Sequence, residues 1–153
     1  MRRVVDTAHA GDWPATHAAE QVTLGFDDRV RRRMRLVSDS GGAFLLDLPE
    51  VVRLADGDGL HLDDGAWIGV RAALEPVVEV ICETPDELAR IAWHLGNRHI
   101  AAQITTGTVR FRDDPVIAEM IEGLGAKTSF LMAPFQPEAG AYHRHEHNGH
   151  SHG

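Results

Sequence analysis

The feature that most constrains the fold is a change of pattern near Ala72. Before it, short apolar segments are separated by tight turns; after it, strand-like and helix-like segments alternate. From residue 73 to residue 136 their order is strand, helix, strand, strand, helix, strand, which is the order of a ferredoxin-like split βαβ fold. The sequence therefore predicts a ferredoxin-like domain over residues 73–136.

The first helix of this domain has a strong start. Thr84 stands at the N-cap position, Pro85 follows at the first helical position, and Glu87 lies three residues after the cap. Apolar residues then recur at helical spacing, namely Leu88, Ile91, Ala92 and Leu95. Gly96 is expected to adopt the left-handed conformation that often follows a helix, so the helix should end near Leu95.

The second half of the domain continues the pattern. Two strand-like segments that meet at Gly107 predict a hairpin. The run Asp113-Asp114-Pro115 predicts the start of a second helix, because acidic residues and proline favour the first turn. A last strand is expected over residues 127–132.

The N-terminal part has a different character. Residues 20–70 predict a small all-β unit of short strands joined by turns such as Gly41-Gly42. Residues 1–20 show no sustained period and are expected to form a loosely ordered lead-in. The fold class is therefore α+β, with three expected parts: an N-terminal β domain at 1–72, the ferredoxin-like domain at 73–136 and a flexible histidine-rich tail at 137–153.

Composition narrows the classes of function. A formal charge of −8 and a pI near 5.6 weigh against a nucleic-acid binder and suit a protein that handles cations. Cys82 is the single cysteine, so neither a disulfide nor a CxxC metal site can form. No apolar run reaches the roughly 20 residues of a membrane span, and the first residues lack the apolar core of a secretory signal. We therefore expect a cytoplasmic protein without membrane contact.

Two histidines flank the expected end of the first helix. If the helix continued, His94 and His99 would lie about 140° apart at roughly 100° per residue, so they cannot chelate a metal as an i,i+4 pair. With the helix ended between them, His99 is projected by a loop or by the start of a strand. One histidine cannot hold a transition metal alone, but two copies across a two-fold axis could supply half of a four-ligand site.

Half of all the histidine in the chain lies near its C-terminus, at His143, His145, His147, His150 and His152. A histidine-rich tract is a metal-binding composition, and imidazole suits nickel, copper and zinc. An expression tag is the alternative interpretation. Tags are usually uninterrupted, whereas these histidines are interleaved with Arg144, Glu146 and Asn148.

An arginine-rich segment marks one of the expected strands. Alternate residues of this strand, on one face, are Arg31, Arg33 and Arg35, while Met34 and Leu36 lie on the other face. Such a strand can simply be solvated, or its charge can protect a sheet edge from unwanted pairing. The alternative is a docking patch for an acidic partner. The choice stays open at this point.

No motif for enzymatic catalysis is present. The sequence contains no HExxH, GxSxG or Walker glycine loop. The paired acids Asp63 and Asp64 fall in an expected turn with no group to couple to them. We therefore expect a protein that is not an enzyme; a hydrolytic metal site built from His94 and His99 is disfavoured by the expected helix end.

Three short motifs resemble one family. The runs are His94-Leu95-Gly96-Asn97-Arg98-His99, then Gln103-Ile104, then Leu124-Gly125-Ala126, and together they resemble the UreE family of urease accessory proteins, which are nickel metallochaperones. The likeness covers roughly residues 20–135. It implies an N-terminal β domain used in partner contact and a ferredoxin-like metal domain. It also implies a homodimer with His99 of each chain on nickel at the interface.

The chain departs from the family at one place. Some members carry a His-x-His pair just before the second helix, where this chain has Asp113-Asp114-Pro115. Asp113 could offer an oxygen ligand there, and His94 is a second possible auxiliary ligand. The resemblance does not assign roles to the individual tail histidines.

The leading hypothesis is a homodimeric Ni²⁺ carrier that delivers the ion to apo-urease within a complex of accessory proteins. His99 would hold the metal in an open shell that the tail completes, and the face of Arg31, Arg33 and Arg35 would contact the partner. Zn²⁺ and Cu²⁺ are expected to compete, because ligand type does not select nickel over them. The alternative is a histidine-rich metal buffer or storage protein without a dedicated delivery partner.

Overall fold

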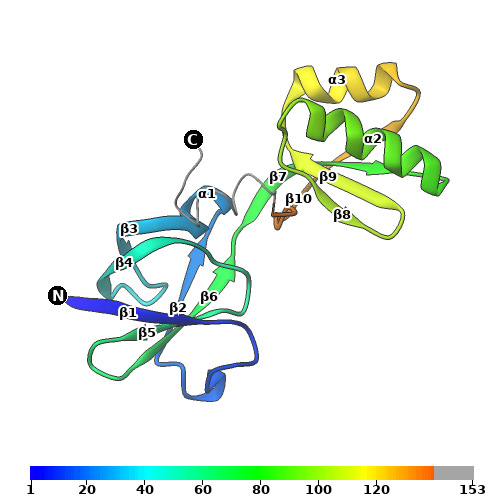
Figure 1. The fold of residues 1–153 in the computed structure, drawn as a ribbon. Helices are drawn as coiled ribbons and strands as arrows, with labels where there is room; N and C mark the ends of the chain where they lie inside the picture. The colour runs from blue at the N-terminus through cyan, green and yellow to red at the C-terminus, as the bar shows by residue number, and fades with distance from the viewer. Residues whose placement is uncertain (140–153) are drawn as a thin grey trace. The chain divides into compact units, whose positions relative to one another are not determined.

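A computed structural model describes residues 1–139 of the chain. They form two units, Met1–Ala73 and a second unit that begins at Leu74 (Figure 1). Each unit encloses its own cluster of buried apolar side chains. The fold is α+β, with many strands and few helices, as predicted. The expected histidine tail falls largely outside the described residues.

The N-terminal unit is built on one six-stranded sheet. Its strands are β1 (Arg2–Ala8), β2 (Glu20–Leu24), β3 (Val30–Val37), β4 (Ala43–Arg53), β5 (Gly59–Leu62) and β6 (Trp67–Ala72). Their order in the sheet is β2-β6-β5-β1-β4-β3, with parallel pairing of β1 to β4 and of β2 to β6. A 3-10 turn, η1 (Ala15–His17), and a short helix, α1 (Phe26–Arg29), lie in the connections.

The expectation of a loosely ordered lead-in over residues 1–20 is wrong. Strand β1 lies in the middle of the sheet, between β4 and β5. Only Val4 of this strand is fully buried, so its own sequence carries almost no alternation of apolar and polar residues. Its conformation is determined by pairing with strands further along the chain, such as Arg2 with Phe44 in β4 and Val4 with Leu62 in β5.

The turn expected at Gly41-Gly42 is confirmed. Ser38 N–H donates to Gly42 O over 2.8 Å, Gly41 N–H donates to Ser38 O over 2.9 Å, and Gly41 has a φ of 98°. This is a three-residue hairpin loop with glycine at its left-handed position. It fixes the register in which Leu36 faces Phe44, and both of these side chains are buried.

Arg29, the first arginine of the arginine-rich segment, has a structural role. Its side chain is almost fully buried, and it donates from Nε to Leu24 O and from Nη1 to Leu54 O. These bonds join the end of β2 to the residue that follows β4. Arg29 is therefore not part of the exposed arginine face formed by Arg31, Arg33 and Arg35.

The second unit follows the predicted element order. It contains β7 (Leu74–Ile81), α2 (Pro85–Asn97), β8 (Gln103–Thr105), β9 (Thr108–Arg112), α3 (Pro115–Gly123) and β10 (Lys127–Pro134). The sheet order is β10-β7-β9-β8 with antiparallel pairing throughout. Helices α2 and α3 cover one face of this sheet (Figure 1), and their apolar residues pack against β7 and β9. No helix within residues 1–139 is long and apolar enough to span a membrane.

Both predicted helix starts are confirmed. Thr84 Oγ1 accepts the Glu87 N–H over 3.0 Å, and the Glu87 carboxylate accepts the Glu83 N–H over 2.8 Å. At α3, the Asp114 carboxylate accepts the N–H groups of Val116 and Ile117. Side chains thus satisfy backbone donors that helix geometry leaves without partners.

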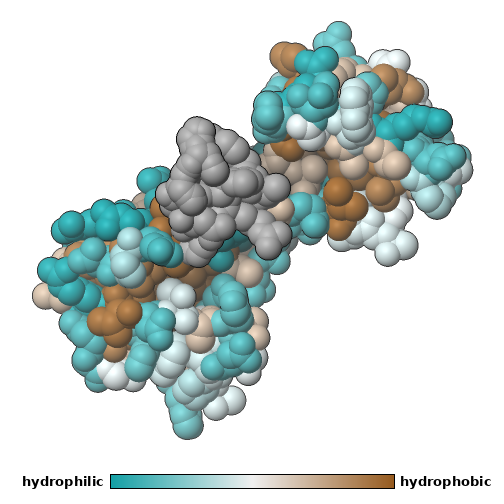
Figure 2. All heavy atoms as spheres, in the orientation of Figure 1, coloured by the Kyte–Doolittle hydropathy of each residue, from teal (hydrophilic) through white to brown (hydrophobic). Residues whose placement is uncertain are grey.

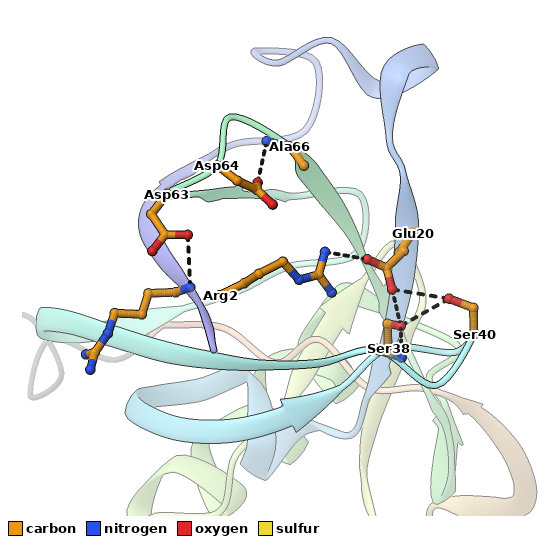
Figure 3. A network of polar contacts seen from close by, with 9 residues as sticks. Arg2, Glu20, Ser38, Ser40, Asp63, Asp64 and Ala66 are labelled. Atoms are coloured by element: carbon orange, nitrogen blue, oxygen red, sulfur yellow. Dashed lines mark hydrogen bonds and ion pairs between the residues drawn. The ribbon is translucent and has the colours of Figure 1, made fainter.

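A polar cluster around Glu20 ties the N-terminal unit together (Figure 3). Glu20 accepts from Arg2 Nη1 at 2.7 Å, from Ser38 Oγ at 2.5 Å and from Ser40 Oγ at 3.2 Å. These contacts connect β1, β2 and the β3–β4 turn. A Cβ added at Gly42 would lie 2.6 Å from the Glu20 carboxylate, so glycine leaves the space that the cluster occupies.

The hydrogen bonds from Arg2 and then from Ser38 hold the pKa of Glu20 below its ordinary value. The cluster therefore stabilises the fold fully above the ordinary carboxylate pKa, and this stabilisation is lost as the pH falls through the lower value of the folded state.

We expect Glu20→Gln to lower the free energy of unfolding of the N-terminal unit by about 1.5–3 kcal/mol at neutral pH, the usual range for hydrogen bonds to a charged group. The difference from the unmodified chain should shrink in acid. Urea unfolding followed by the fluorescence of Trp13 and Trp67, in a Trp93→Phe background, measures it. Asp12→Asn, at an exposed position, is the control; an equal loss of stability in this control would contradict the role of the cluster.

Candidate metal-binding site

His99 follows the end of α2 in an unusual backbone conformation. The helix ends at Asn97 with Arg98 as C-cap, and His99 comes next with a φ of 59°. Within residues 1–139 it is the only non-glycine residue in the left-handed region. This conformation costs an L-residue other than glycine about 1–2 kcal/mol. Such outliers persist where surrounding structure enforces them, and they cluster at functional sites.

Two backbone hydrogen bonds enforce this conformation. Ile100 N–H donates to Leu95 O over 2.9 Å, and His99 N–H donates to Gly96 O over 3.0 Å. This pair of bonds is the Schellman motif. Leu95 is fully buried, and Ile100 packs against the same apolar cluster. Core packing on both sides therefore holds the backbone of His99, while its side chain is exposed.

The expectation that Gly96 is the left-handed residue is wrong. Gly96 lies inside α2, and the helix extends two residues beyond Leu95. A stop at Gly96 would put Asn97 where the motif prefers an apolar residue, whereas a stop at His99 puts Ile100 there. The apolar residue five positions after Leu95 is the signal in the sequence that indicates the true helix end.

The structure brings His99 close to the start of α3. His99, Ile100 and Ala101 line an open depression of about 450 Å³ together with Arg112, Asp113 and Asp114. These segments meet at the end of the sheet where β7 begins. Helix α2 runs back along β7 and ends near this point, and β9, which is antiparallel to β7, ends there as well. The pairing of Arg112 with Val77 and the bond from Asp113 N–H to Pro76 O, 3.0 Å long, fix this end of the sheet.

The acidic residues of this depression differ in availability. Asp114 is occupied as the N-cap of α3. Asp113 is exposed, and no side-chain partner of its carboxylate is found among residues 1–139. The Arg112 guanidinium lies 5.8 Å from the centre of the Phe135 ring. The imidazole of His99 and the carboxylate of Asp113 are thus the two groups at the depression that suit a metal ion.

His94 is placed differently from His99. It is half-buried on α2, its ring meets that of Trp93 edge-on with centroids 5.1 Å apart, and it does not line the depression. In the described part of the chain, no group of three or more His, Cys, Asp or Glu side chains could hold a metal ion. A complete site therefore needs ligands from elsewhere.

The described end of the chain returns to the neighbourhood of His99, a feature that sequence reasoning missed. Phe135 is fully buried, Gln136 N–H donates to the Gln103 side-chain oxygen over 2.9 Å, and Glu138 N–H donates to Ala102 O over 2.8 Å. We call residues 135–138 the strap. It anchors the chain three residues from His99. The five tail histidines predicted as ligands, His143 to His152, lie beyond the strap and outside the described residues.

The left-handed conformation of His99 leads to a test of strain. His99→Gly should stabilise the second unit by up to about 1 kcal/mol, because glycine adopts this conformation without steric cost. His99→Val should destabilise it, since branching at Cβ makes the conformation harder to reach. Urea unfolding followed by Trp93 fluorescence measures both variants. A loss of stability in His99→Gly would show that the residue is not strained.

Two family models together match nearly the whole chain. The N-terminal domain of the UreE urease accessory protein matches residues 1–73, and its C-terminal domain matches residues 75–153. Both matches follow the division of the structure into two units.

Relatives with the same name share about half of their residues with this chain. "Urease accessory protein UreE" of Rhodopseudomonas palustris (strain BisB18) is 54% identical over 125 residues, which cover 82% of this chain and 59% of the relative. The protein of that name from Chelativorans sp. (strain BNC1) is 50% identical over 88% of this chain and 85% of its own length.

The protein of that name from Rhodobacter capsulatus is 44% identical over all of this chain and 94% of the relative. These relatives are named as accessory proteins, which confirms the expectation of a protein that is not an enzyme. The chain belongs to the UreE family of urease accessory proteins.

Proposed function

We propose that this protein is a urease accessory metallochaperone that binds Ni²⁺ and delivers it for assembly of the urease nickel centre. Its family supports a role in urease maturation. The observation that carries the proposal is the exposed imidazole of His99, held in a left-handed conformation beside the free carboxylate of Asp113. An exposed ligand leaves a bound ion accessible to a partner, which transfer needs.

The incomplete ligand set among residues 1–139 supports a homodimer. A two-fold axis close to His99 would double the available groups to two imidazoles and two carboxylates, because such an interface places the same residues on both sides. Val116, two residues after the Asp114 cap, is 75% exposed and offers apolar surface near the depression. We also assign the second unit to the ferredoxin-like class, which its element order and its sheet order β10-β7-β9-β8 support.

The strap supports a role for the tail in completing the shell. An extended chain spans at most about 3.6 Å per residue. His99 therefore lies within about 11 Å of Ala102, and His143 can lie no further than about 18 Å from Glu138. The tail ligands would be His143, His145, His147, His150 and His152. Their imidazoles suit nickel, although zinc and copper would compete for them. Of the two possible auxiliary ligands, Asp113 lines the depression and His94 does not.

The proposed partners are apo-urease and other urease accessory proteins in the cytoplasm. The surface that we propose for partner contact is the arginine face of β3, formed by Arg31, Arg33 and Arg35. All three residues are exposed, and the side chains of Arg31 and Arg33 are 47% and 61% accessible.

Nickel stoichiometry tests the core of the proposal. A chain of residues 1–139, which keeps the strap and lacks the tail, should bind about half an ion per chain, as expected for one shared site per dimer. His99→Ala should abolish this binding, and His94→Ala is the matched control that should retain it. Titration calorimetry combined with light scattering gives both stoichiometry and oligomeric state.

The same experiment separates the carrier from the alternative of a metal buffer, which the five tail histidines would favour. A buffer loses nearly all nickel binding when residues 140–153 are removed. If the shortened chain binds no nickel, the carrier proposal fails.

The strap gives a second prediction. In the full chain, Gln103→Ala removes the acceptor for Gln136 N–H, so the tail should be held less closely to His99. Nickel affinity should fall by up to about fivefold, which corresponds to one hydrogen bond of about 1 kcal/mol. The same substitution in residues 1–139 should change nothing. An equal effect in both chains would mean that Gln103 acts on the fold and not on the tail.

A further inference from the structure

Strand β3 forms one edge of the six-stranded sheet. It pairs with β4 on one side and is the last strand in the order of the sheet. An edge strand presents backbone N–H and C=O groups that pair with no other strand of the sheet, and such a row can accept an added strand. The strand covers Val30–Val37, and its register against β4 is regular over residues 33–37, which provide five residues for such pairing.

The hairpin shows which backbone groups point outward. Ser38 and Gly42 are a hydrogen-bonded pair, because Ser38 N–H donates to Gly42 O. Hydrogen-bonded and non-hydrogen-bonded pairs alternate along an antiparallel ladder. Leu36 and Met34 therefore bond to β4. The N–H and C=O groups of Arg33, Arg35 and Val37 point toward the edge that pairs with no strand of residues 1–139, and the register is regular over this stretch. Just beyond it, Asp39 N–H on the same edge donates to Gln21 O of β2 over 2.8 Å.

Two of the four exposed arginines of the strand, Arg33 and Arg35, are outward residues; the other two are Arg31 and Arg32. Arg33 and Arg35 are exposed on the face opposite Leu36, which is buried. The Asp47 carboxylate lies 2.6 Å from the Arg3 guanidinium and 4.0 Å from that of Arg33. Arg35, by contrast, has no carboxylate partner among residues 1–139.

Arg31 contacts Asp28 at 3.4 Å. Among residues 1–139, the arginines at positions 3, 31, 33 and 35 thus have two carboxylate partners, Asp28 and Asp47, which leaves a positive patch on a chain with a formal charge of −8. Arg32 is also exposed and donates to Leu48 O. In Figure 2, hydrophilic residues cover much of the visible surface where Figure 1 places the outer end of β3. The sign of this patch, opposite to that of the whole chain, favours an acidic partner.

We propose that the free edge of β3 binds an acidic segment of a partner protein in extended conformation, as an added strand whose alternate carboxylates face Arg33 and Arg35. Backbone pairing supplies affinity in this mode of recognition, and alternate side chains supply specificity. Guanidinium groups match carboxylates with two parallel hydrogen bonds. The acidic segment is the chemistry that we assign to the partner at the arginine face of β3, and this inference rests on the partner contact proposed above.

Charge on an edge strand can also serve only to prevent pairing. The two roles differ in what happens to the backbone. In a protective edge, the outward amides stay open to water with or without an acidic ligand. In a docking edge, these same amides become hydrogen-bonded when the ligand binds, while the inward amides do not change.

Amide hydrogen exchange of the full chain, followed by NMR, tests the proposal. The probe is a synthetic peptide with glutamate at every second position and threonine between. In the free protein, the amides of Arg33, Arg35 and Val37 should exchange fast and those of Met34 and Leu36 slowly. Saturation with peptide should slow exchange of the three outward amides by about tenfold or more, as expected for formation of a hydrogen-bonded ladder.

Substitutions test the charge component. Arg35→Glu should weaken peptide binding by about tenfold or more, because the paired carboxylate then meets a like charge. Arg35→Lys should retain part of the affinity, since it keeps the charge but not the planar fork. Arg90→Glu, at an exposed position on α2, is the matched control and should bind as the unmodified chain does.

Three results would overturn the proposal. One is the absence of peptide binding, and another is binding that leaves the outward amides unprotected. The third is equal binding of inorganic polyphosphate or of a peptide with all glutamates in one block, which would indicate a general anion site. The assay contains no nickel, so it stands apart from the metal proposal; a His99→Ala chain should bind the peptide unchanged.

Discussion

The hydrogen bond from Ile100 N–H to Leu95 O is the constraint on which the candidate metal site depends. This bond ends α2 while the side chains of Leu95 and Ile100 both pack in the apolar core. It leaves His99, the residue before Ile100, no alternative to a left-handed backbone. Glycine would fill that position without strain. Histidine there keeps an imidazole at a fixed point on the surface. Packing of Leu95 and Ile100 in the core thus positions His99, whose side chain is exposed.

Sheet topology then supplies the neighbours of His99. Because β9 runs antiparallel to β7, the junction before α3 lies at the same end of the sheet as the end of α2. The strap returns to this end and binds the backbone of Ala102. Three segments that are distant in the sequence therefore meet around one depression. The arginine edge belongs to the other unit, so metal binding and partner contact, as proposed, use separately folded parts of the chain.

Local signals in the sequence predicted local structure well. Thr84, Asp114 and the Gly41 turn act through residues within a few positions, so their roles could be derived before the structure was known. Strand β1 has no such local signal, because its conformation is determined by pairing with β4 and β5. Residue type alone favours Gly96 as the helix end, whereas the apolar contact of Ile100 with the core selects His99. The proximity of Asp113 to His99 and the strap are tertiary features that no periodicity reveals.

The lack of a complete ligand set among residues 1–139 is consistent with transfer. Closed zinc sites enclose the ion with four protein ligands and hold it for structure, whereas sites that act on the ion or its ligands keep positions open. In the proposed site, His99 and Asp113 would supply two groups and leave the rest to a second copy and to the tail. Each added ligand would raise affinity, and each could leave separately, so the ion would not have to lose its whole shell at once. A cage built into one rigid unit would bind nickel more securely and release it more slowly, which is the wrong balance for a carrier.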